Sequence, residues 1–159
     1  MFVFESLLLL FAANGAPIIL CKMLGKRFDW PVDFGLLWPD SKPIFGPSKT
    51  WRGIACAILV SATTAYFLGL GAFSGLVVGL LAMLGDLISS FAKRRLGIPS
   101  SGMALGLDQI PEALLPLLWL KGDLGISYRM VILLVAVFLV LELGISRVLF
   151  WLHIRKQPY

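Results

Sequence analysis

An aspartate stands inside an apolar run in the stretch LGDLISSFAKRR, residues 84–95. On a helix, Ser90 falls one turn after Asp86 and Lys93 falls two turns after it, so the three share a face. An ionisable group within a membrane helix is costly and usually faces a partner or a water-filled cavity. A solvated helix end would explain the basic residues of this stretch. It would not explain Asp86, which is therefore a candidate site residue.

Two further carboxylates follow a connection rich in glycine and serine. Asp108 and Glu112 are four residues apart at the start of the next apolar segment, hence on one face of a helix. Asp108 could equally be a helix N-cap, and this alternative stays open. If these carboxylates converged with Asp86, they would repel one another unless a cation lay between them. Such oxygen ligands suit Mg²⁺, and the sequence has no His and Cys cluster of the kind that binds zinc.

The stretch FGPSKTWRG, residues 45–53, has the parts of a phosphate-binding loop. Glycine and proline shape the turn, and the N-terminus of a predicted helix follows, whose free amides attract anions. The alternative is a plain basic loop with Trp51 as a membrane-interface anchor. The basic residues of such a loop could bind anionic lipid headgroups. The hydroxyls and cations that this loop offers to a phosphate are Ser48, Lys49, Thr50 and Arg52.

The first apolar segment contains AANGAP, residues 12–17. Asn14 and Gly15 precede Pro17, so we expect this helix to be interrupted or kinked where it lines a cavity. Asn14 could then hydrogen-bond a polar ligand headgroup. It could also be an amide that packs two helices together, and the sequence does not separate these roles.

Composition indicates which elements position these groups. The 159-residue chain is 58% hydrophobic with a mean hydropathy of +0.89, which excludes an ordinary soluble domain, about 45–50% apolar. We predict an all-α membrane helix bundle that forms a single domain, residues 1–159. The fourth span is short and holds two prolines, so a re-entrant segment is its alternative. The five predicted transmembrane helices are residues 2–21, 53–70, 73–91, 109–120 and 130–152.

The distribution of lysine and arginine predicts the orientation, because cytoplasmic loops collect these residues. They concentrate in residues 22–52, in residues 92–108 and at Arg155 and Lys156. We therefore expect the N-terminus outside, the C-terminus in the cytoplasm, and both loops on the cytoplasmic side of the cell membrane. Residues 22–52 are then the predicted substrate loop, so the candidate site faces the cytoplasm.

With these residues in view, the chain resembles the CDP-archaeol synthase family and, more distantly, the phosphatidate cytidylyltransferases. The resemblance covers nearly the whole length. The spacing G-D-x-x-x-S-x-x-K-R is its specific part, and the cytidylyltransferases carry the same order. The matching stretches are PVDFG at 31–35, GPSKTWRG at 46–53, GDLISSFAKRRLG at 85–97 and LDQ at 107–109.

The resemblance implies transfer of a cytidylyl group from CTP to the phosphate of a membrane lipid, with release of pyrophosphate. The lipid would be an archaetidic-acid-like molecule or a phosphatidate. Carried over, Asp86 and Asp108 would hold Mg²⁺, while Lys49 and Arg52 would bind the nucleotide phosphates. The groups implied for the lipid phosphate or the leaving pyrophosphate are Ser90, Lys93 and Arg94.

Two positions depart from the family pattern. Family members usually carry an acid three residues after the aspartate of the LDQ motif, and this chain has Pro111 there, followed by Glu112. Either Glu112 supplies the second carboxylate or metal binding is weakened. The cytidylyltransferases also have a Lys-Asp pair after the KR motif, where this chain reads Pro99-Ser100.

The implied reaction agrees with the chemistry of the residues. A lipid phosphate is already an anionic nucleophile, so positioning and charge neutralisation suffice without a general base. The expected partners are CTP, a lipid phosphate and membrane lipids, with no nucleic acid. The glycine-rich stretch at 69–75 could pack helices within or between chains, which leaves a homo-oligomer open. A small ion-coupled transporter and an inactive relative of the enzyme are the alternative functions.

Overall fold

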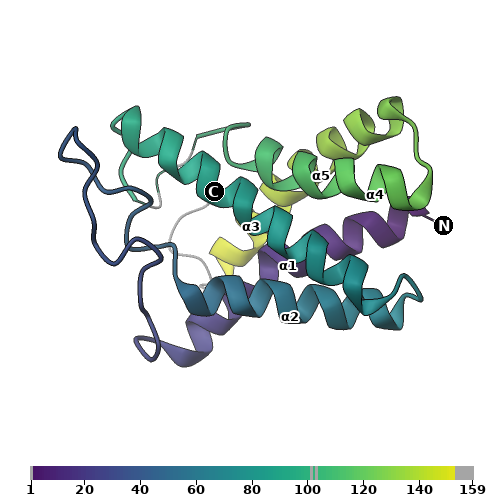
Figure 1. The fold of residues 1–159 in the computed structure, drawn as a ribbon, viewed down its shortest axis with the longest axis horizontal. Helices are drawn as coiled ribbons and strands as arrows, with labels where there is room; N and C mark the ends of the chain where they lie inside the picture. The colour runs from purple at the N-terminus through teal and green to yellow at the C-terminus, as the bar shows by residue number, and fades with distance from the viewer. Residues whose placement is uncertain (1, 101, 103, 153–159) are drawn as a thin grey trace.

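The part of the chain that the structure describes forms five helices (Figure 1). The structure is a computed structural model and describes residues 2–100, 102 and 104–152. Over these ranges the only β pairing consists of two isolated bridges, Pro31 with Thr50 and Leu37 with Pro43, which confirms the predicted all-α fold. The helices are α1 (Phe2–Leu24), α2 (Trp51–Phe67), α3 (Ala72–Arg95), α4 (Gln109–Leu124) and α5 (Tyr128–Trp151).

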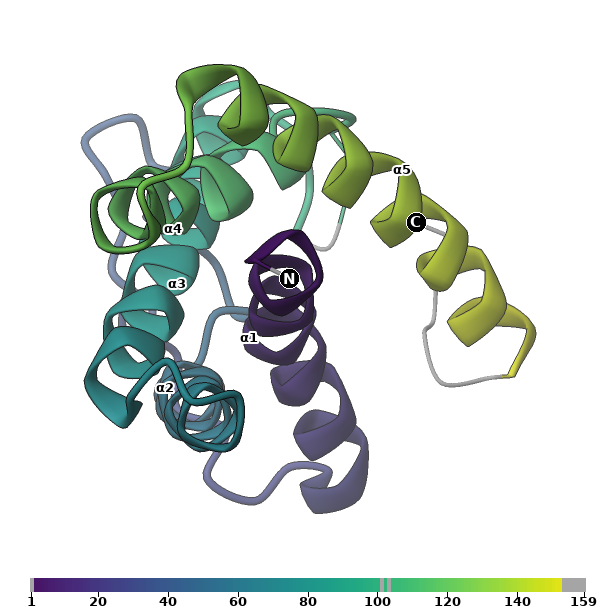
Figure 2. The same ribbon diagram turned by 90° about the vertical axis from the view of Figure 1, so that its right-hand side faces the viewer.

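The helices pack in an order that brings the two long connections together. α3 contacts α1, α2 and α4, while α5 packs on α4 and touches α1 (Figure 2). The connections 25–50 and 96–108 lie at the same end of the bundle, opposite the N-terminus (Figure 1). This is the arrangement that an alternating series of membrane helices requires.

Within the described ranges, three helices are long and apolar enough to cross a membrane: Val3–Leu24, Ala72–Arg95 and Tyr128–Val148. α2 and α4, with 17 and 16 residues, measure about 26 and 24 Å at 1.5 Å per residue. Both are a little shorter than a hydrocarbon layer of roughly 30 Å. Their ends must therefore lie close to the lipid headgroups.

One helix runs through Pro17, so the expected interruption of α1 is wrong, while the alternative of a kink stays a prediction. Asn14 donates from Nδ2 to the Leu10 carbonyl at 3.0 Å, within its own helix. Ala13 is fully buried beside Ala57, Ala82 and Met83. Neighbouring helices thus support α1 where proline removes an N–H donor, as they can in a membrane bundle.

Small residues let α2 and α3 approach closely. A Cβ placed on Gly75 would lie 2.2 Å from the Ser61 carbonyl oxygen, and one on Gly79 would lie 2.8 Å from the Ile58 Cα. Such backbone contact replaces the hydrophobic driving force that helices lack in lipid. Gly75 of the stretch 69–75 therefore packs helices within the chain. Whether copies of the chain associate stays a prediction.

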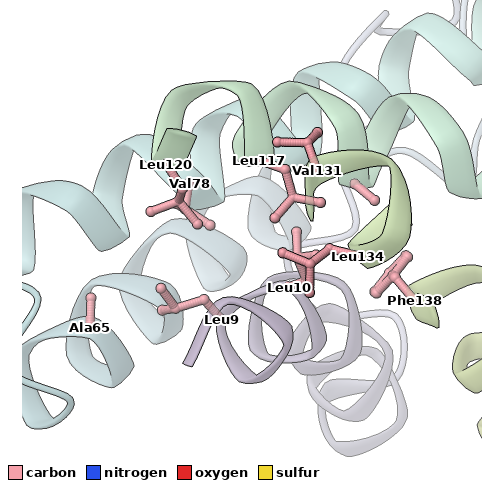
Figure 3. Packing of buried hydrophobic residues seen from close by; sticks show 10 residues of the cluster. Leu9, Leu10, Ala65, Val78, Leu117, Leu120, Val131, Leu134 and Phe138 are labelled. Atoms are coloured by element: carbon pink, nitrogen blue, oxygen red, sulfur yellow. The ribbon is translucent and has the colours of Figure 1, made fainter. Parts of the chain in front are cut away.

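A cluster of buried apolar side chains joins the helices toward the end that carries the N-terminus (Figure 3). It draws on all five helices, with Ala65 from α2, and the rings of Phe11 and Phe138 lie 5.1 Å apart. Its largest described members are Leu9, Leu10, Val78, Leu117, Leu120, Val131, Leu134 and Phe138.

A second close approach joins α3 to α4 beside the candidate site. A Cβ on Gly85 would lie 2.4 Å from the Pro111 carbonyl oxygen and 2.6 Å from the Glu112 nitrogen. These are backbone atoms, which cannot move without shifting the first turn of α4. Gly85 therefore fixes the distance between Asp86, the next residue, and the start of α4.

We predict that Gly85→Ala destabilises the protein by about 1–3 kcal/mol, the usual cost of overpacking. Thermal unfolding in detergent would measure this loss. Gly144→Ala in α5 is the matched control, because its Cβ would meet no atom within 4 Å. Equal unfolding temperatures for the two variants would show that the α3–α4 contact is not tight.

Candidate active site

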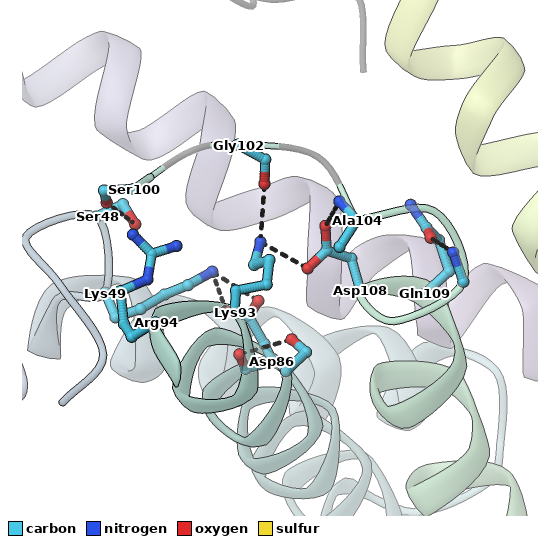
Figure 4. Close-up of polar contacts among 12 residues, drawn as sticks. Ser48, Lys49, Asp86, Lys93, Arg94, Ser100, Gly102, Ala104, Asp108 and Gln109 are labelled. Carbon is cyan, nitrogen blue, oxygen red and sulfur yellow. Dashed lines mark hydrogen bonds and ion pairs between the residues drawn. The ribbon is translucent and has the colours of Figure 1, made fainter. Parts of the chain in front are cut away.

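Two lysine–aspartate pairs lie where α3, α4 and the connection 25–50 meet (Figure 4). Lys49 Nζ donates to both oxygens of Asp86, at 2.6 and 2.7 Å. Lys93 Nζ lies 2.6 Å from Asp108 Oδ1. Four residues that the sequence singled out are thus brought together, although they come from distant parts of the chain. The pairing itself was not predicted.

The Lys49–Asp86 pair is partly open to solvent. Both side chains keep 21% of their surface exposed. An ion pair that solvent reaches contributes little to stability, so either group can exchange its partner for a charged ligand. This pair is therefore suited to bind an anion through Lys49 and a cation through Asp86.

The Lys93–Asp108 pair is more enclosed and closes the connection between α3 and α4. Lys93 also donates to the Gly102 carbonyl at 3.1 Å, and Asp108 Oδ2 accepts from the Ala104 N–H at 3.1 Å. Asp108 is the N-cap residue of α4 by position, as the alternative expected, but its side chain makes no capping hydrogen bond. The carboxylate turns back toward the connection instead.

Glu112 lies close to both pairs and is 7% exposed. Asp86, Glu142 and Asp108 repel its charge, and Lys49 attracts it. Asp86 and Asp108 are therefore both within electrostatic range of Glu112. Even so, among the described residues no three His, Cys, Asp or Glu side chains are arranged to hold a metal ion. The three-carboxylate magnesium site stays a prediction.

Further donors line the same end of α3. Arg94 is 6% exposed and donates from Nη2 to the Pro99 carbonyl at 2.9 Å, which leaves its buried Nε without a hydrogen bond. Ser90, one turn before it, is 1% exposed, and its hydroxyl has no hydrogen-bond partner. Both residues thus retain hydrogen-bonding capacity beside the two pairs.

The predicted phosphate loop divides into two parts. Ser48 lies beside the α3–α4 connection, where its hydroxyl is 3.0 Å from that of Ser100. Thr50 caps α2 by accepting from the Gly53 N–H at 3.3 Å. Ser48 and Lys49 therefore face the site, while Thr50 has a structural role that the sequence analysis did not assign to it.

Arg52 fastens α2 to the end of α1. It donates to the Gly25 carbonyl at 2.8 Å and to the Arg27 carbonyl, and it pairs with Asp29 at 2.7 Å. Its side chain is 7% exposed. These contacts explain why the loop is held in place. A contact of Arg52 with nucleotide phosphates stays a prediction.

Asp33 organises the connection, a role that the sequence analysis missed although it quoted the PVDFG stretch. Asp33 is buried and accepts N–H bonds from Gly35, Phe45 and Gly46 at 2.8–3.1 Å. The Val32 N–H donates to the Lys49 carbonyl at 2.8 Å. An aspartate before Phe-Gly is a turn signal that could have indicated this role.

Burial raises the pKa of Asp33, but the N–H groups of Gly46, Phe45 and Gly35 stabilise its charge, so that its pKa lies below the ordinary 3.8. The carboxylate therefore stabilises the fold above that value. It loses this contribution as the pH falls through the lower, folded-state pKa.

We predict that Asp33→Asn costs about 1–3 kcal/mol at neutral pH, because charge-assisted hydrogen bonds are lost. The difference from the unsubstituted protein should shrink in acid below the ordinary pKa. Thermal unfolding at neutral and acid pH tests both parts. Asp40→Asn, a more exposed position on the same loop, should cost less. A difference for Asp33→Asn that did not change with pH would count against the carboxylate role.

Arg95 holds the other half of the connection against α3. It pairs with Asp40 at 3.0 Å, and its guanidinium lies 4.9 Å from the Phe91 ring centroid and 5.9 Å from that of Trp38. Lys42 donates back to the Arg95 carbonyl at 3.1 Å. Arg95 is thus a structural clamp, unlike Lys93 and Arg94 beside it.

Comparisons with known proteins show which family this chain resembles. Residues 70–159 match the family model described as CarS-like, CDP-archaeol synthase. The CDP-archaeol synthase of Pyrobaculum aerophilum is 32% identical over 154 residues, which cover 94% of this chain and 92% of that protein. The CDP-archaeol synthase of Saccharolobus islandicus is 32% identical over 156 residues, with 94% and 90% covered.

A solved structure, reported as structural insight into an intramembrane enzyme for archaeal membrane lipids biosynthesis, has the same fold. It aligns with a TM-score of 0.71 at 31% identity, over 89% of this chain and 90% of that one. The family model and the full-length relatives together establish the family. The chain belongs to the CDP-archaeol synthase family, whose members are CTP-dependent cytidylyltransferases.

Proposed function

We propose that the protein transfers a cytidylyl group from CTP to an archaetidic-acid-like lipid phosphate, forming a CDP-lipid and pyrophosphate. The observation that carries this proposal is the pairing of Lys49 with Asp86 and of Lys93 with Asp108 at one end of the bundle. The archaeal relatives, which are CDP-archaeol synthases, support the ether-linked lipid over a phosphatidate.

In this reaction an oxygen of the lipid phosphate attacks the α-phosphorus of CTP. The bond from the α-phosphorus to the bridging oxygen of the β-phosphate breaks, and pyrophosphate leaves with that bonding pair. The nucleophile is already ionised, so no proton has to be removed. The protein must bring two polyanions together, which requires cations aimed at the phosphates.

Lys49, Lys93 and Arg94 supply that positive charge. Lys49 exchanges its carboxylate partner for a nucleotide phosphate, which its solvent-exposed pair permits. Lys93 and Arg94 lie on the more buried side, next to the hydroxyl of Ser90. They are placed to bind the lipid phosphate or the leaving pyrophosphate.

Magnesium fits the donor set of the site. Asp86, Asp108 and Glu112 offer only oxygen, and Asp108 Oδ1 is buried without a hydrogen bond although Lys93 lies close. Mg²⁺ commonly takes one or two protein carboxylates and completes its shell with substrate phosphates, so a preformed cage is not required. When bound there, it would withdraw charge from the phosphate oxygens.

The site is proposed to face the cytoplasm. The basic residues of the connection 25–50, and those at the end of α3, lie at the same end of the bundle as the two pairs (Figure 1). This supports the orientation predicted from the positive-inside rule. Arg155 and Lys156, which also entered that prediction, lie outside the described residues.

We predict that Lys49→Ala raises the KM for CTP and lowers kcat/KM by about 10- to 100-fold, since a charged hydrogen bond to phosphate is lost. The fold should be retained, because the pair it breaks is solvent-accessible. Lys121→Ala, in the last turn of α4 at the other end of the bundle, is the control. An unchanged dependence of rate on CTP would contradict the role of Lys49.

The lipid specificity can be tested with mixtures. Purified protein receives CTP together with ether-linked and ester-linked lipid phosphates, and mass spectrometry identifies the product. The proposal expects the ether-linked CDP-lipid to dominate. Preferential use of phosphatidate would overturn the lipid assignment while retaining the reaction. Absence of any CDP-lipid would favour the transporter or the inactive relative.

A further inference from the structure

Four aromatic side chains form an exposed surface at the same end of the protein as the site. We call Phe28, Trp30, Phe34 and Trp51 the aromatic surface. Phe34 is 70% exposed, and Phe28 and Trp30 are exposed to nearly the same extent. Asp33, between two of these residues, points inward and organises the loop. The loop therefore has a polar interior that faces the site and an apolar exterior.

The aromatic surface is tied to the first turn of α2. The Trp51 N–H donates to the Trp30 carbonyl at 3.1 Å, and the Phe34 and Trp51 rings lie 6.5 Å apart. The rings of Phe28 and Trp30 meet edge to face at 6.4 Å. Trp30 and Phe34 therefore lie at the depth of Trp51, and Phe28 is held beside them.

Two of these exposed residues have unfavourable backbone conformations. Phe28 has φ of 55° and Phe34 has φ of 48°. A bulky residue in this left-handed region costs about 1–2 kcal/mol, whereas Gly or Asn adopts it readily. In water, Asn would suit both the backbone and the solvent better than Phe. Phenylalanine at both positions is therefore explained if an apolar medium covers the rings.

The position of α2 identifies that medium. α2 is about 26 Å long, and it begins at the end of the bundle where α3, a helix long enough to cross a membrane, ends (Figure 1). Trp51, the first residue of α2, is therefore placed near the boundary between hydrocarbon and headgroups. Aromatic residues gather at this depth in membrane proteins. Lys22, Lys26 and Arg27 lie close by in sequence and are exposed, and such residues attract anionic headgroups.

The backbone of this loop also forms internal hydrogen bonds. Within the described loop, the N–H groups of Val32, Phe34 and Leu36 donate to the carbonyls of Lys49, Pro31 and Asp33. A loop that enters the interface needs such internal bonds, because fewer water molecules are available there.

We infer that the aromatic surface is seated in the headgroup region of a bilayer that contains anionic lipids. The loop that carries Asp33 and Lys49 is then anchored at the depth of the lipid phosphates. The occupant of this surface is the lipid bilayer, and neither a second copy of the chain nor another protein is needed to cover it. This inference does not depend on the proposed reaction.

Site-directed fluorescence tests the inference in the full chain. Cys21 and Cys56, the free cysteines, are replaced by Ser and Ala, and a bimane label is attached in single variants Phe34→Cys or Phe28→Cys. Ser41→Cys is the matched control, because Ser41 is exposed, lies on the same loop and has φ of 60°. The proteins are reconstituted in vesicles of phosphatidylcholine and phosphatidylglycerol.

We expect lipids with a nitroxide near the headgroup to quench the labels at 28 and 34 several-fold more than the label at 41. Aqueous iodide should show the reverse order. Equal iodide quenching at 34 and 41 would overturn the inference, because the surface would then be in water. Protection of both labels from iodide and from nitroxide lipid would also overturn it, and would identify a protein as the cover.

An unlabelled measurement gives an independent check. Brominated lipids should quench the part of the tryptophan emission that Trp30→Phe removes. If acrylamide in water quenches that part instead, Trp30 lies outside the interface and the inference fails.

Discussion

Asp86→Asn should lower the rate of CDP-lipid formation at least about 100-fold, the cost of losing a preorganised electrostatic group in an active site. Asp86 orients Lys49 through two short contacts and lies within electrostatic range of Glu112. Asparagine keeps the shape of the side chain but removes the charge that binds a cation and holds Lys49. The measurement is product formation in detergent at saturating CTP and Mg²⁺.

Asp123→Asn is the control for this variant. Asp123 accepts a hydrogen bond from Ser74 at 2.8 Å, between the start of α3 and the end of α4, and is therefore at the other end of the bundle. It should retain activity. Full activity in Asp86→Asn would contradict both the metal-binding role of Asp86 and its role in orienting Lys49. Partial recovery at higher Mg²⁺ would support the metal role in particular.

Asp108→Asn should lower the rate of CDP-lipid formation about as much as Asp86→Asn does. It should also destabilise the protein. Lys93 has 8% of its side chain exposed, and the substitution leaves its charge without a counter-ion. An unpaired buried polar group costs about 1–3 kcal/mol, and charged groups cost more. Thermal unfolding and product formation are measured on the same preparation.

The double variant Lys93→Met with Asp108→Asn separates the two effects. Methionine fills a similar volume without a charge, so stability should recover toward that of the unsubstituted protein. Activity should not recover, because two site residues are missing. Recovery of activity along with stability would show that Asp108 is only structural.

The sequence was sufficient for the features that depend on local pattern. Hydropathy predicted five helices, and the structure differs from the predicted spans mainly at their ends. Helical spacing put Asp86 and Lys93 on one face of α3, and both lie at the site. These inferences succeed because a membrane helix must pair its backbone N–H and C=O groups within the same segment. The length of such a helix and the residues on each face can therefore be predicted from consecutive residues.

Contacts between distant residues were beyond such reasoning. Lys49 and Asp86 are 37 residues apart, and their pairing depends on how the connection 25–50 folds over α3. The same holds for Asp33 and for the contact of Gly85 with Pro111, which follow from tertiary packing. Gly85, the residue before Asp86, could be seen in the sequence, but its close contact with α4 could not be predicted from it.

Two differences between expectation and structure have a common cause. Pro17 was expected to interrupt or kink α1, and the Asp108 side chain was allowed as a cap of α4, both from local preference alone. In the structure, packing of Ala13 against neighbouring helices stabilises the first segment. Asp108 lies near a buried lysine that draws its carboxylate away from the helix end. Tertiary contacts outweighed local propensity at both positions.

The fate of labelled CTP tests the central claim most directly. Purified protein in detergent with Mg²⁺ and a lipid phosphate receives CTP labelled either at the α-phosphate or at the γ-phosphate. Cytidylyl transfer predicts that the α-label enters the lipid fraction and the γ-label appears as pyrophosphate, in equal amounts. Entry of the γ-label into lipid, or retention of both labels in CTP, would contradict the account.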